Sequence, residues 1–258
     1  MLAELEQEYA SPLNNSIQPS TEYLFEWVED LKQLQEIQRF RAQQFSEQFG
    51  IQFPQGIDQD LYDFGCEHAV LRDKDTREIV AYTRLKFFQG NELAQSYSAN
   101  EFKIAEKLAH LDNVVEIGRT CVHSRYRSTK ALSVLWLNLI PKVLWSMRAK
   151  YIIGCVSIRL EGNQARAYYT HQYLNNLAVE KTIDIQSHNA FEPQLPEYSF
   201  AQDEKIPKLF DIYLNLQAKL SQQAYFDAEF NCLDYFVFLE ASKMARNFML
   251  QKKRAEHC

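Results

Sequence analysis

The sequence predicts an α/β fold in one domain, with a central mixed β-sheet flanked by helices and a helical and strand extension at its C-terminal end. Segments of strand character alternate with amphipathic helical segments along the chain, which is typical of α/β proteins. The apolar run of residues 151–158, YIIGCVSI, is typical of a strand covered on both faces. No internal repeat divides the 258 residues, a length that one large domain can accommodate.

The first half of the chain is expected to begin with a flexible lead-in over residues 1–20, before a domain over residues 21–258. Apolar residues at helical spacing predict a long helix over residues 21–49, with Arg41 on its apolar face. Strands are predicted over residues 68–71 and 79–88, joined by a turn at residues 73–76. A helical segment over residues 99–108 and a strand over residues 114–122 follow.

The second half is expected to alternate helix and strand up to the C-terminus. A helix over residues 129–149 has an apolar face, and Pro141 should kink it because proline removes one backbone hydrogen bond. The strand of residues 151–158 comes next, then helices over residues 164–174 and 207–220. A strand over residues 234–239 and a closing helix complete the predicted order.

Composition excludes several classes of protein. The chain has 28 basic and 34 acidic residues and a net charge of −6, which argues against a nucleic-acid partner. Its five cysteines include no Cys-x-x-Cys pair, so a zinc ribbon or disulfide framework is not expected. The polar N-terminus is not a signal peptide, and the apolar stretch of residues 131–145 is too short and interrupted to span a bilayer. We therefore expect a cytoplasmic protein with reduced thiols.

Common catalytic motifs are absent. The sequence has no Gly-x-Gly-x-x-Gly, no P-loop and no Gly-x-Ser-x-Gly, and its six histidines show no metal-ligand spacing. These absences disfavour a Rossmann dehydrogenase, a kinase and a zinc hydrolase, and no metal site is predicted.

Two clusters of polar residues remain as candidates. Asp60 and Asp63 precede a predicted strand, and Arg84 lies late in the next strand. Glu116 and Arg119 lie near the end of the strand of residues 114–122. The second cluster continues into a basic loop before a helix, with Arg125, Arg127 and Lys130. A basic loop at a helix N-terminus suits a phosphate or an acidic partner, although a solvated helix-initiating loop would read the same way.

The spacing of these residues resembles a known group of enzymes. The series Arg41, Phe45, Asp60-x-x-Asp63, Arg84 and Glu116-x-x-Arg119 resembles the framework of acyl-homoserine-lactone synthases of the GNAT superfamily. The string EIGRTCVH at residues 116–123, followed by Tyr126-Arg127 and Leu135-Trp136, is closer to the acyl-carrier-protein-dependent ornithine N-acyltransferases, often labelled hemolysin-like. The likeness covers about residues 36–243 and implies a GNAT-like fold.

The resemblance implies transfer of a (3-hydroxy)fatty acyl group from acyl carrier protein to the α-amine of L-ornithine, the first step of ornithine-lipid synthesis. It implies no bound cofactor, because the 4′-phosphopantetheine thioester of the carrier protein is a co-substrate. The loop of residues 123–129 lacks the glycines usual in the superfamily. That loop therefore suits the single phosphate of a carrier-protein arm better than the pyrophosphate of free coenzyme A.

The resemblance also implies roles for the candidate residues. Glu116 would be the general base, beside Arg119, and the backbone of residues 114–122 would polarise the thioester. Asp60 and Asp63 would hold the side-chain ammonium of ornithine, and Arg84 its α-carboxylate. A competing interpretation is an ion-pair network joining Arg41 to these three residues. The basic residues Arg125, Arg127 and Lys130 would dock acyl carrier protein.

Three alternatives stay open at this stage. The acceptor could be another amino acid, such as lysine, glycine or glutamine. The enzyme could be a lactone synthase, although the chain lacks the usual tryptophan after the first helix and is longer than those enzymes. It could also be a non-catalytic module that binds acyl carrier protein. The basic tail of residues 252–254 would allow transient contact with the inner membrane.

Overall fold

A computed structural model describes residues 22–127, 129–244 and 246 of the chain. The expected lead-in over residues 1–20 and the basic tail of residues 252–254 lie outside these residues. Within the part of the chain that the structure describes, no helix combines the length and the apolar character that a bilayer crossing demands.

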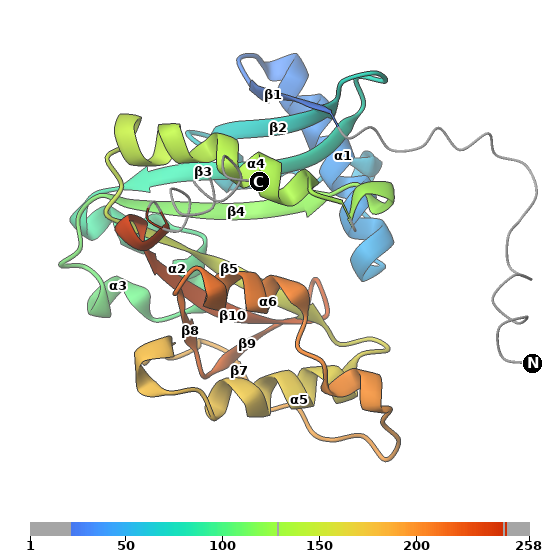
Figure 1. Cartoon of the computed structure of the whole chain (residues 1–258), viewed down its shortest axis with the longest axis vertical. Coiled ribbons are helices and arrows are strands. Elements are labelled where there is room, and N and C mark those ends of the chain that lie inside the picture. The colour runs from blue at the N-terminus through green and yellow to red at the C-terminus, as the bar shows by residue number, and fades with distance from the viewer. Residues whose placement is uncertain (1–21, 128, 245, 247–258) are drawn as a thin grey trace, which may run out of the picture.

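Ten strands form one mixed sheet at the centre of the described residues, with β1–β2–β3–β4–β5–β10–β8–β6 side by side. Strands β7 and β9 lie off this path, where β9 pairs with β10 and β7 pairs with β9. Figure 1 shows β1 to β4 in the upper part of the view and β5, β10 and β8 in the lower part. The strands are β1 (Tyr23–Trp27), β2 (Glu67–Asp73), β3 (Ile79–Phe88), β4 (Val114–Val122), β5 (Tyr151–Arg159), β6 (Thr182–Ile183), β7 (Ala190–Phe191), β8 (Lys219–Ser221), β9 (Ala224–Asp227) and β10 (Cys232–Glu240).

Helices cover both faces of this sheet (Figure 1). The α-helices are α1 (Leu31–Phe49), α2 (Ser98–Glu101), α3 (Ile104–Lys107), α4 (Ala131–Pro141), α5 (Gln164–Asn175) and α6 (Lys208–Asn215). Side chains of successive strand residues point to opposite faces, so Ala69 and Leu71 share a core with α4 whereas Val70 between them packs against α1. The core under α4 continues below α5 and α6, and the opposite face is covered by α1, α2 and α3. The predicted α/β architecture with a mixed central sheet is confirmed.

The prediction of one helix over residues 21–49 is wrong in its first part. Residues Tyr23–Trp27 form β1, which pairs antiparallel with β2, and α1 begins only at Leu31. Asp30 is the helix N-cap, and its side chain accepts a hydrogen bond of 2.8 Å from the backbone N–H of Gln33. Leu31, which the helical spacing placed in the apolar stripe, is 74% exposed.

Most of the other predicted elements agree with the structure, and one predicted helix is too long. Strand β4 has the predicted bounds, and β2, β3, β5 and β10 each contain the predicted strand. The predicted helix with the kink is α4, which ends at Pro141 and continues as a π-helical turn over Lys142–Ser146. The predicted helix over residues 207–220 is too long, because α6 ends at Asn215 and residues 219–221 form β8.

The parallel strands β4 and β5 separate partway along their length. They pair only from Val114 and Tyr151 to Glu116 and Ile153. At the next position Gly154 approaches β4 so closely that a Cβ atom would lie 2.5 Å from the carbonyl oxygen of Ile117, which no side chain tolerates. Beyond this point β4 stays paired with β3 through a bulge, where Arg119 has a φ of 51°. The separation opens the sheet between β4 and β5.

Candidate active site

A cleft of about 1120 Å³ opens where β4 and β5 separate. Its walls come from strands that are distant in sequence, with Arg84 on β3, Arg119 on β4, Ser157 on β5 and Asp234 on β10. Aromatic side chains of Phe45, Tyr62, Tyr97, Trp136, Tyr213 and Phe230 complete the lining. Charged groups therefore face each other across a partly aromatic cleft.

Behind one wall lies a network of ion pairs, here called the arginine–aspartate network. Its members are Arg41, Arg84 and Arg119 with Asp58, Asp60 and Asp63. Arg41 is fully buried and binds Asp63 with both terminal nitrogens, at 2.6 and 2.8 Å, in the geometry that a guanidinium and a carboxylate favour. Its Nε lies 2.9 Å from Asp58. Arg41 thus joins helix α1 to the loop that carries the aspartates.

The two predicted aspartates differ in how deeply their side chains are buried. The side chain of Asp63 is fully buried, and its oxygens accept from Arg41, Gln38 and Arg84. Burial alone would raise the pKa of Asp63, but the hydrogen bonds and charge of Arg41, assisted by Gln38 and Arg84, hold it well below its usual range. Asp60 keeps 17% of its side chain exposed and accepts from Arg84 at 2.5 Å and from Arg119 at 3.1 Å. Burial is likewise outweighed at Asp60, mainly by Arg84, and the pKa is lowered.

Arg84 and Arg119 connect this network to the cleft. Arg84 binds Asp60 and Asp63 through one terminal nitrogen, and its guanidinium lies 5.6 Å from the ring centroid of Tyr62. Arg119 lies 4.9 Å from the ring centroid of Phe230, a cation–π distance. Both arginines line the cleft, whereas Arg41, Asp60 and Asp63 lie behind it.

Glu116 lines the cleft at the point where β4 and β5 separate, and it is 7% exposed. One carboxylate oxygen accepts from the backbone N–H of Tyr97 at 2.9 Å. The other accepts from the backbone N–H of Ser98 at 2.7 Å and from its hydroxyl at 2.6 Å. Glu116 therefore bonds the start of α2 instead of Arg119.

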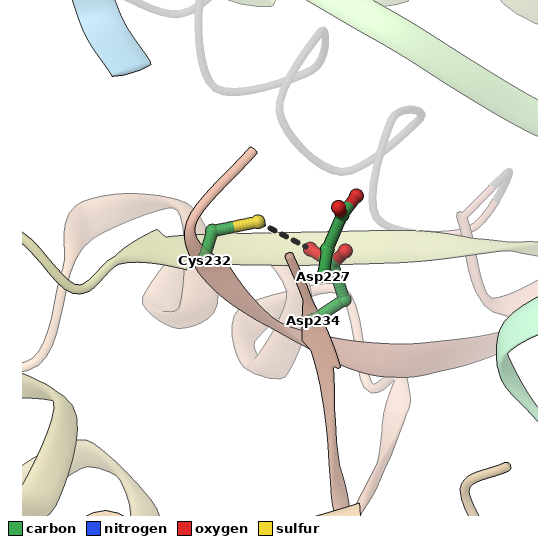
Figure 2. A group of neighbouring side chains, drawn as sticks. All are labelled: Asp227, Cys232 and Asp234. Atoms are coloured by element: carbon green, nitrogen blue, oxygen red, sulfur yellow. Dashed lines mark hydrogen bonds between the residues drawn. The ribbon is translucent and has the colours of Figure 1, made fainter. Parts of the chain in front are cut away.

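The wall opposite the arginines is acidic. Asp227 at the end of β9 and Asp234 on β10 line the cleft together with Cys232. Figure 2 shows the three side chains together, with the Cys232 thiol 3.6 Å from Oδ1 of Asp234. Burial raises the pKa of Asp234 to about 6. Glu101 at the end of α2 lies beside Asp234, and burial followed by the charge of Asp234 raises its pKa well above the usual range. We call Glu101, Asp227 and Asp234 the acidic wall.

An apolar cavity of about 480 Å³ continues from the cleft under α4 and α6. It shares Ile117, Trp136, Gly154 and Tyr213 with the cleft. Its remaining walls are Leu139, Val143, Ile152, Ile153, Leu216, Val237, Leu239 and Met244. The separation of β4 and β5 therefore leads from charged groups into an apolar interior.

The basic residues Arg125, Arg127 and Lys130 lie apart from the cleft, in the loop between β4 and α4. All three are exposed, although Arg125 forms an ion pair of 2.6 Å with Glu78. Arg127 donates from Nε to the carbonyl of Val122 at 3.3 Å, at the end of β4. The loop that joins the cleft-lining strand β4 to α4 therefore carries three exposed positive charges.

Sequence reasoning found part of this constellation. The structure brings Arg41, Asp60, Asp63, Arg84 and Arg119 into one network and places Glu116 beside it in the cleft. Asp58 belongs to the network but was not selected, although the run Asp58-x-Asp60-x-x-Asp63 is the signal that could have shown it. The acidic wall was also missed, because its members come together only when β9 and β10 join β5.

Comparison with known proteins finds similarity to acyltransferases. The profile of the Acetyltransferase (GNAT) domain family matches residues 40–137, which include the second half of α1 and all of β2, β3 and β4. An L-ornithine N(alpha)-acyltransferase of Rhodobacter capsulatus is 23% identical over 244 residues, covering 86% of this chain and 92% of that protein. A protein of the same name from Agrobacterium fabrum is 27% identical over 212 residues, covering 74% of this chain and 70% of that one.

Solved structures share the fold at low sequence identity. A CoA-dependent acyl-homoserine lactone synthase, BjaI, superposes with a TM-score of 0.51 at 9% identity, covering 87% of each chain. FeeM, an N-acyl amino acid synthase from uncultured soil microbes, superposes with a TM-score of 0.50 at 9% identity, covering 86% of this chain and 93% of that one. The expected GNAT-like fold is confirmed.

Proposed function

We propose that this chain, an acyltransferase with the GNAT fold, transfers a fatty acyl group from a carrier-protein thioester to the α-amine of L-ornithine. The observation that carries the proposal is the cleft between β4 and β5, which has arginines on one wall, carboxylates on the other and an apolar cavity behind it. An amino acid with two amines and one carboxylate suits the charged part of this cleft. A fatty acyl chain suits the apolar cavity.

The reaction is a nucleophilic attack of the α-amine on the thioester carbonyl. The amine is protonated at neutral pH, so a base must take a proton before attack. Glu116 lines the cleft and is our candidate for this base, acting directly or through water. The C–N bond forms as the C–S bond breaks, and the pantetheine thiolate leaves and takes up a proton.

Backbone groups of β4 are our candidates for stabilising the tetrahedral intermediate. Successive N–H groups of a strand alternate between its two sides. Beyond Glu116, β4 does not pair with β5, so the N–H groups of residues 117–120 that do not bond β3 are available to the cleft, and the bulge at Arg119 decides which ones they are. Such preorganised donors stabilise an oxyanion in a partly buried site.

Arginines of the cleft are suited to the α-carboxylate of the acceptor. Arg84 uses one terminal nitrogen for Asp60 and Asp63, and its planar fork offers further donors toward the cleft. Asp60 and Asp63 then act through Arg84, as positioning residues. Asp63 is fully buried behind the arginines, so it is poorly placed to contact the ornithine ammonium directly.

The apolar cavity is suited to the acyl chain. Ile117, Trp136 and Tyr213 form its mouth, next to the point where the thioester carbonyl would meet the amine. We propose acyl carrier protein as the donor, with Arg125, Arg127 and Lys130 facing its acidic surface. The product of a 3-hydroxyacyl donor would be the first intermediate of ornithine-lipid synthesis.

The test is acyl transfer by the purified full chain with 3-hydroxyacyl and plain acyl carrier protein as donors. Acceptors are L-ornithine, L-lysine, glycine, L-glutamine and S-adenosylmethionine, and mass spectrometry identifies the products. We expect N-acyl-ornithine, with modification at the α-amine. A lactone product, a different preferred acceptor or no transfer with any acceptor would each overturn the proposal.

Glu116→Gln tests the assignment of the base. Glutamine keeps one oxygen, which can accept from the N–H and hydroxyl of Ser98, but its NH2 group cannot accept from the N–H of Tyr97. We expect kcat to fall by about 100-fold, as for loss of a general base, whereas Tm should fall only by the loss of one hydrogen bond. A lower Tm with kcat retained in the folded fraction would make Glu116 a structural cap.

A further inference from the structure

We propose that the acidic wall of the cleft binds the side-chain ammonium of the acceptor and thereby selects a basic amino acid. This inference rests on the proposed acyl transfer to an amino acid. It assigns Asp227 and Asp234 a role in recognition that the arginine–aspartate network cannot fill.

The carboxyl groups of the acidic wall form no salt bridge within the part of the chain that the structure describes. Glu101, Asp227 and Asp234 are 3%, 9% and 4% exposed. Within residues 22–127, 129–244 and 246, none of the three forms an ion pair with lysine or arginine, whereas Arg84 and Arg119 are paired with other aspartates. Buried carboxylates of this kind are costly unless a cation compensates them. A cationic substrate group would supply that compensation.

A second observation independently points to a missing ligand. Oε2 of Glu101 is buried and has no partner within hydrogen-bonding geometry among the described residues, although the side chains of Tyr97 and Cys155 interact with the same carboxyl group. The carboxyl group of Glu101 lies beside Tyr97, Cys155 and Asp234, all of which line the cleft. A buried acceptor left open at this position is matched by a donor that enters with the substrate.

The spacing of the acceptor atoms suits one ammonium group. A side-chain oxygen of Asp227 and one of Asp234 lie within 4.8 Å of each other. A charge-assisted N–H···O bond is about 2.8 Å long, so one ammonium nitrogen can reach two oxygens at this separation. Asp227 uses Oδ1 for the backbone N–H groups of Glu229 and Phe230, which leaves its second oxygen for the ligand.

The alternative occupant is a metal ion, because Cys232 lies within the same 4.8 Å. A thiol binds a metal as the thiolate. Burial and the neighbouring carboxylates, first Asp234 and then Asp227, raise the pKa of Cys232. Its thiol also donates toward Oδ1 of Asp234 at 3.6 Å (Figure 2). The group is therefore better suited to an ammonium than to a metal.

The cleft also orients the acceptor. With the α-carboxylate at Arg84 or Arg119 and the side-chain ammonium at the acidic wall, the α-amine lies between them, near Glu116 and the separation of β4 and β5. The two amines of ornithine would thus be distinguished by position. Acylation at the α-amine follows from this arrangement.

The test compares L-ornithine with L-norvaline, which has the same carbon chain without the δ-amine. The variants are Asp227→Asn, Asp234→Asn and the double variant, and asparagine at position 227 keeps an oxygen for Glu229 and Phe230. Asp211→Asn, an exposed carboxylate on α6, is the matched control. Circular dichroism and Tm establish that each variant folds.

We expect KM for ornithine to rise about 30-fold or more in the double variant. This is the lower end of the effect expected when one partner of a buried charge pair is removed. The values for norvaline should change less than threefold, about the limit of a surface effect, and the control should match the wild type. An unchanged preference for ornithine over norvaline would overturn the proposal. An equal loss of kcat with both acceptors would also overturn it.

Direct binding separates this inference from the proposed function. Calorimetry with ornithine and norvaline needs no acyl donor, so it reports on the acidic wall even if no acyl transfer occurs. Wild-type binding of ornithine that the double variant loses supports the acidic wall. Equal binding of the two amino acids by the wild type contradicts it. Stoichiometric binding of Zn²⁺ alone, lost in Asp234→Asn, together with loss of activity in EDTA, would make the group a metal site instead.

Discussion

The side chain of Asp63 is buried and accepts hydrogen bonds from three other side chains, so its substitution should mainly lower the stability of the fold. In Asp63→Asn the guanidinium of Arg41 stays buried without its bidentate carboxylate. Removing one partner of a buried pair costs about 3–5 kcal/mol, and we expect a loss of this size in urea denaturation. Asp60→Asn is the control, because that side chain is 17% exposed and should lose less. Equal losses in the two variants would contradict the burial argument.

The aspartates and arginines of the network show how much of the site could be predicted from the sequence alone. Aspartates and arginines at short spacing, together with the family resemblance, identify Asp60, Asp63, Arg84 and Arg119. Sequence spacing cannot tell a carboxylate that faces the substrate from one that is neutralised behind it. That distinction depends on Arg41, which reaches the loop from helix α1 and buries Asp63. The sequence therefore predicts the members of the network but not their access to the cleft.

At the scale of elements, the separation of β4 and β5 depends on the close approach at Gly154. In Gly154→Ala the new methyl would meet the carbonyl oxygen of Ile117 at 2.5 Å, so the strands must shift. Overpacking of this kind costs about 1–3 kcal/mol, and we expect that loss in urea denaturation together with a lower kcat. Gly118→Ala is the stability control, since its Cβ would make only an ordinary contact of 3.9 Å with Arg84. A Gly154→Ala variant as stable as the control would show that the strands can shift freely.

The loop between β4 and α4 carries the prediction about the donor. Its charges are exposed, and the ion pair of Arg125 with Glu78 contributes little to stability at that exposure. We expect Arg125→Glu with Arg127→Glu to raise KM for the acyl-carrier substrate and to leave Tm unchanged, because opposite charges attract across an interface. Lys181→Glu, exposed beside the edge strand β6, is the matched control. An unchanged KM would remove this loop from the docking surface.

Helices and strands whose own residues show a continuous pattern of apolar side chains could be predicted from the sequence. Those that form only by pairing with residues distant in the sequence could not. Local sequence alone predicts the bounds of β4 and all but the last residue of β5. Tyr23, Phe25 and Trp27 alternate as a strand requires, whereas Leu24, Trp27 and Val28 extend the helical spacing of the residues after them. Hydrogen bonding to β2 makes residues 23–27 a strand, and the helix begins after its N-cap, Asp30. The short strand β9 depends on its pairing with β10 and β7, so its sequence carries little signal.

At the scale of the whole molecule, two kinds of carboxylate should make stability fall on both sides of a maximum in pH. The pKa of Asp63 is below that of an unfolded aspartate, so its contribution is present above about pH 4 and is lost as the pH falls. The pKa of Asp234 is raised to about 6, so its protonated form stabilises the fold at low pH, and that contribution is lost as the pH rises through 6. The groups that influence Asp234 are Glu101, Asp227, Cys232, Ser157 and Arg119.

Urea denaturation of the ligand-free protein between pH 3 and 8 tests both expected declines of the unfolding free energy, the one at acid pH and the one at higher pH. Asp234→Asn should remove part of the decline between about pH 4 and 7, while Asp63→Asn should flatten the decline on the acid side. Asp211→Asn should leave both slopes in place. Ornithine should oppose the decline at higher pH, because ionisation of the acidic wall creates the charge that an ammonium compensates. If Asp234→Asn declined as steeply as the wild type over that range, Asp234 would already be ionised below it, and the cleft would keep its negative charge at all pH values where the protein is folded.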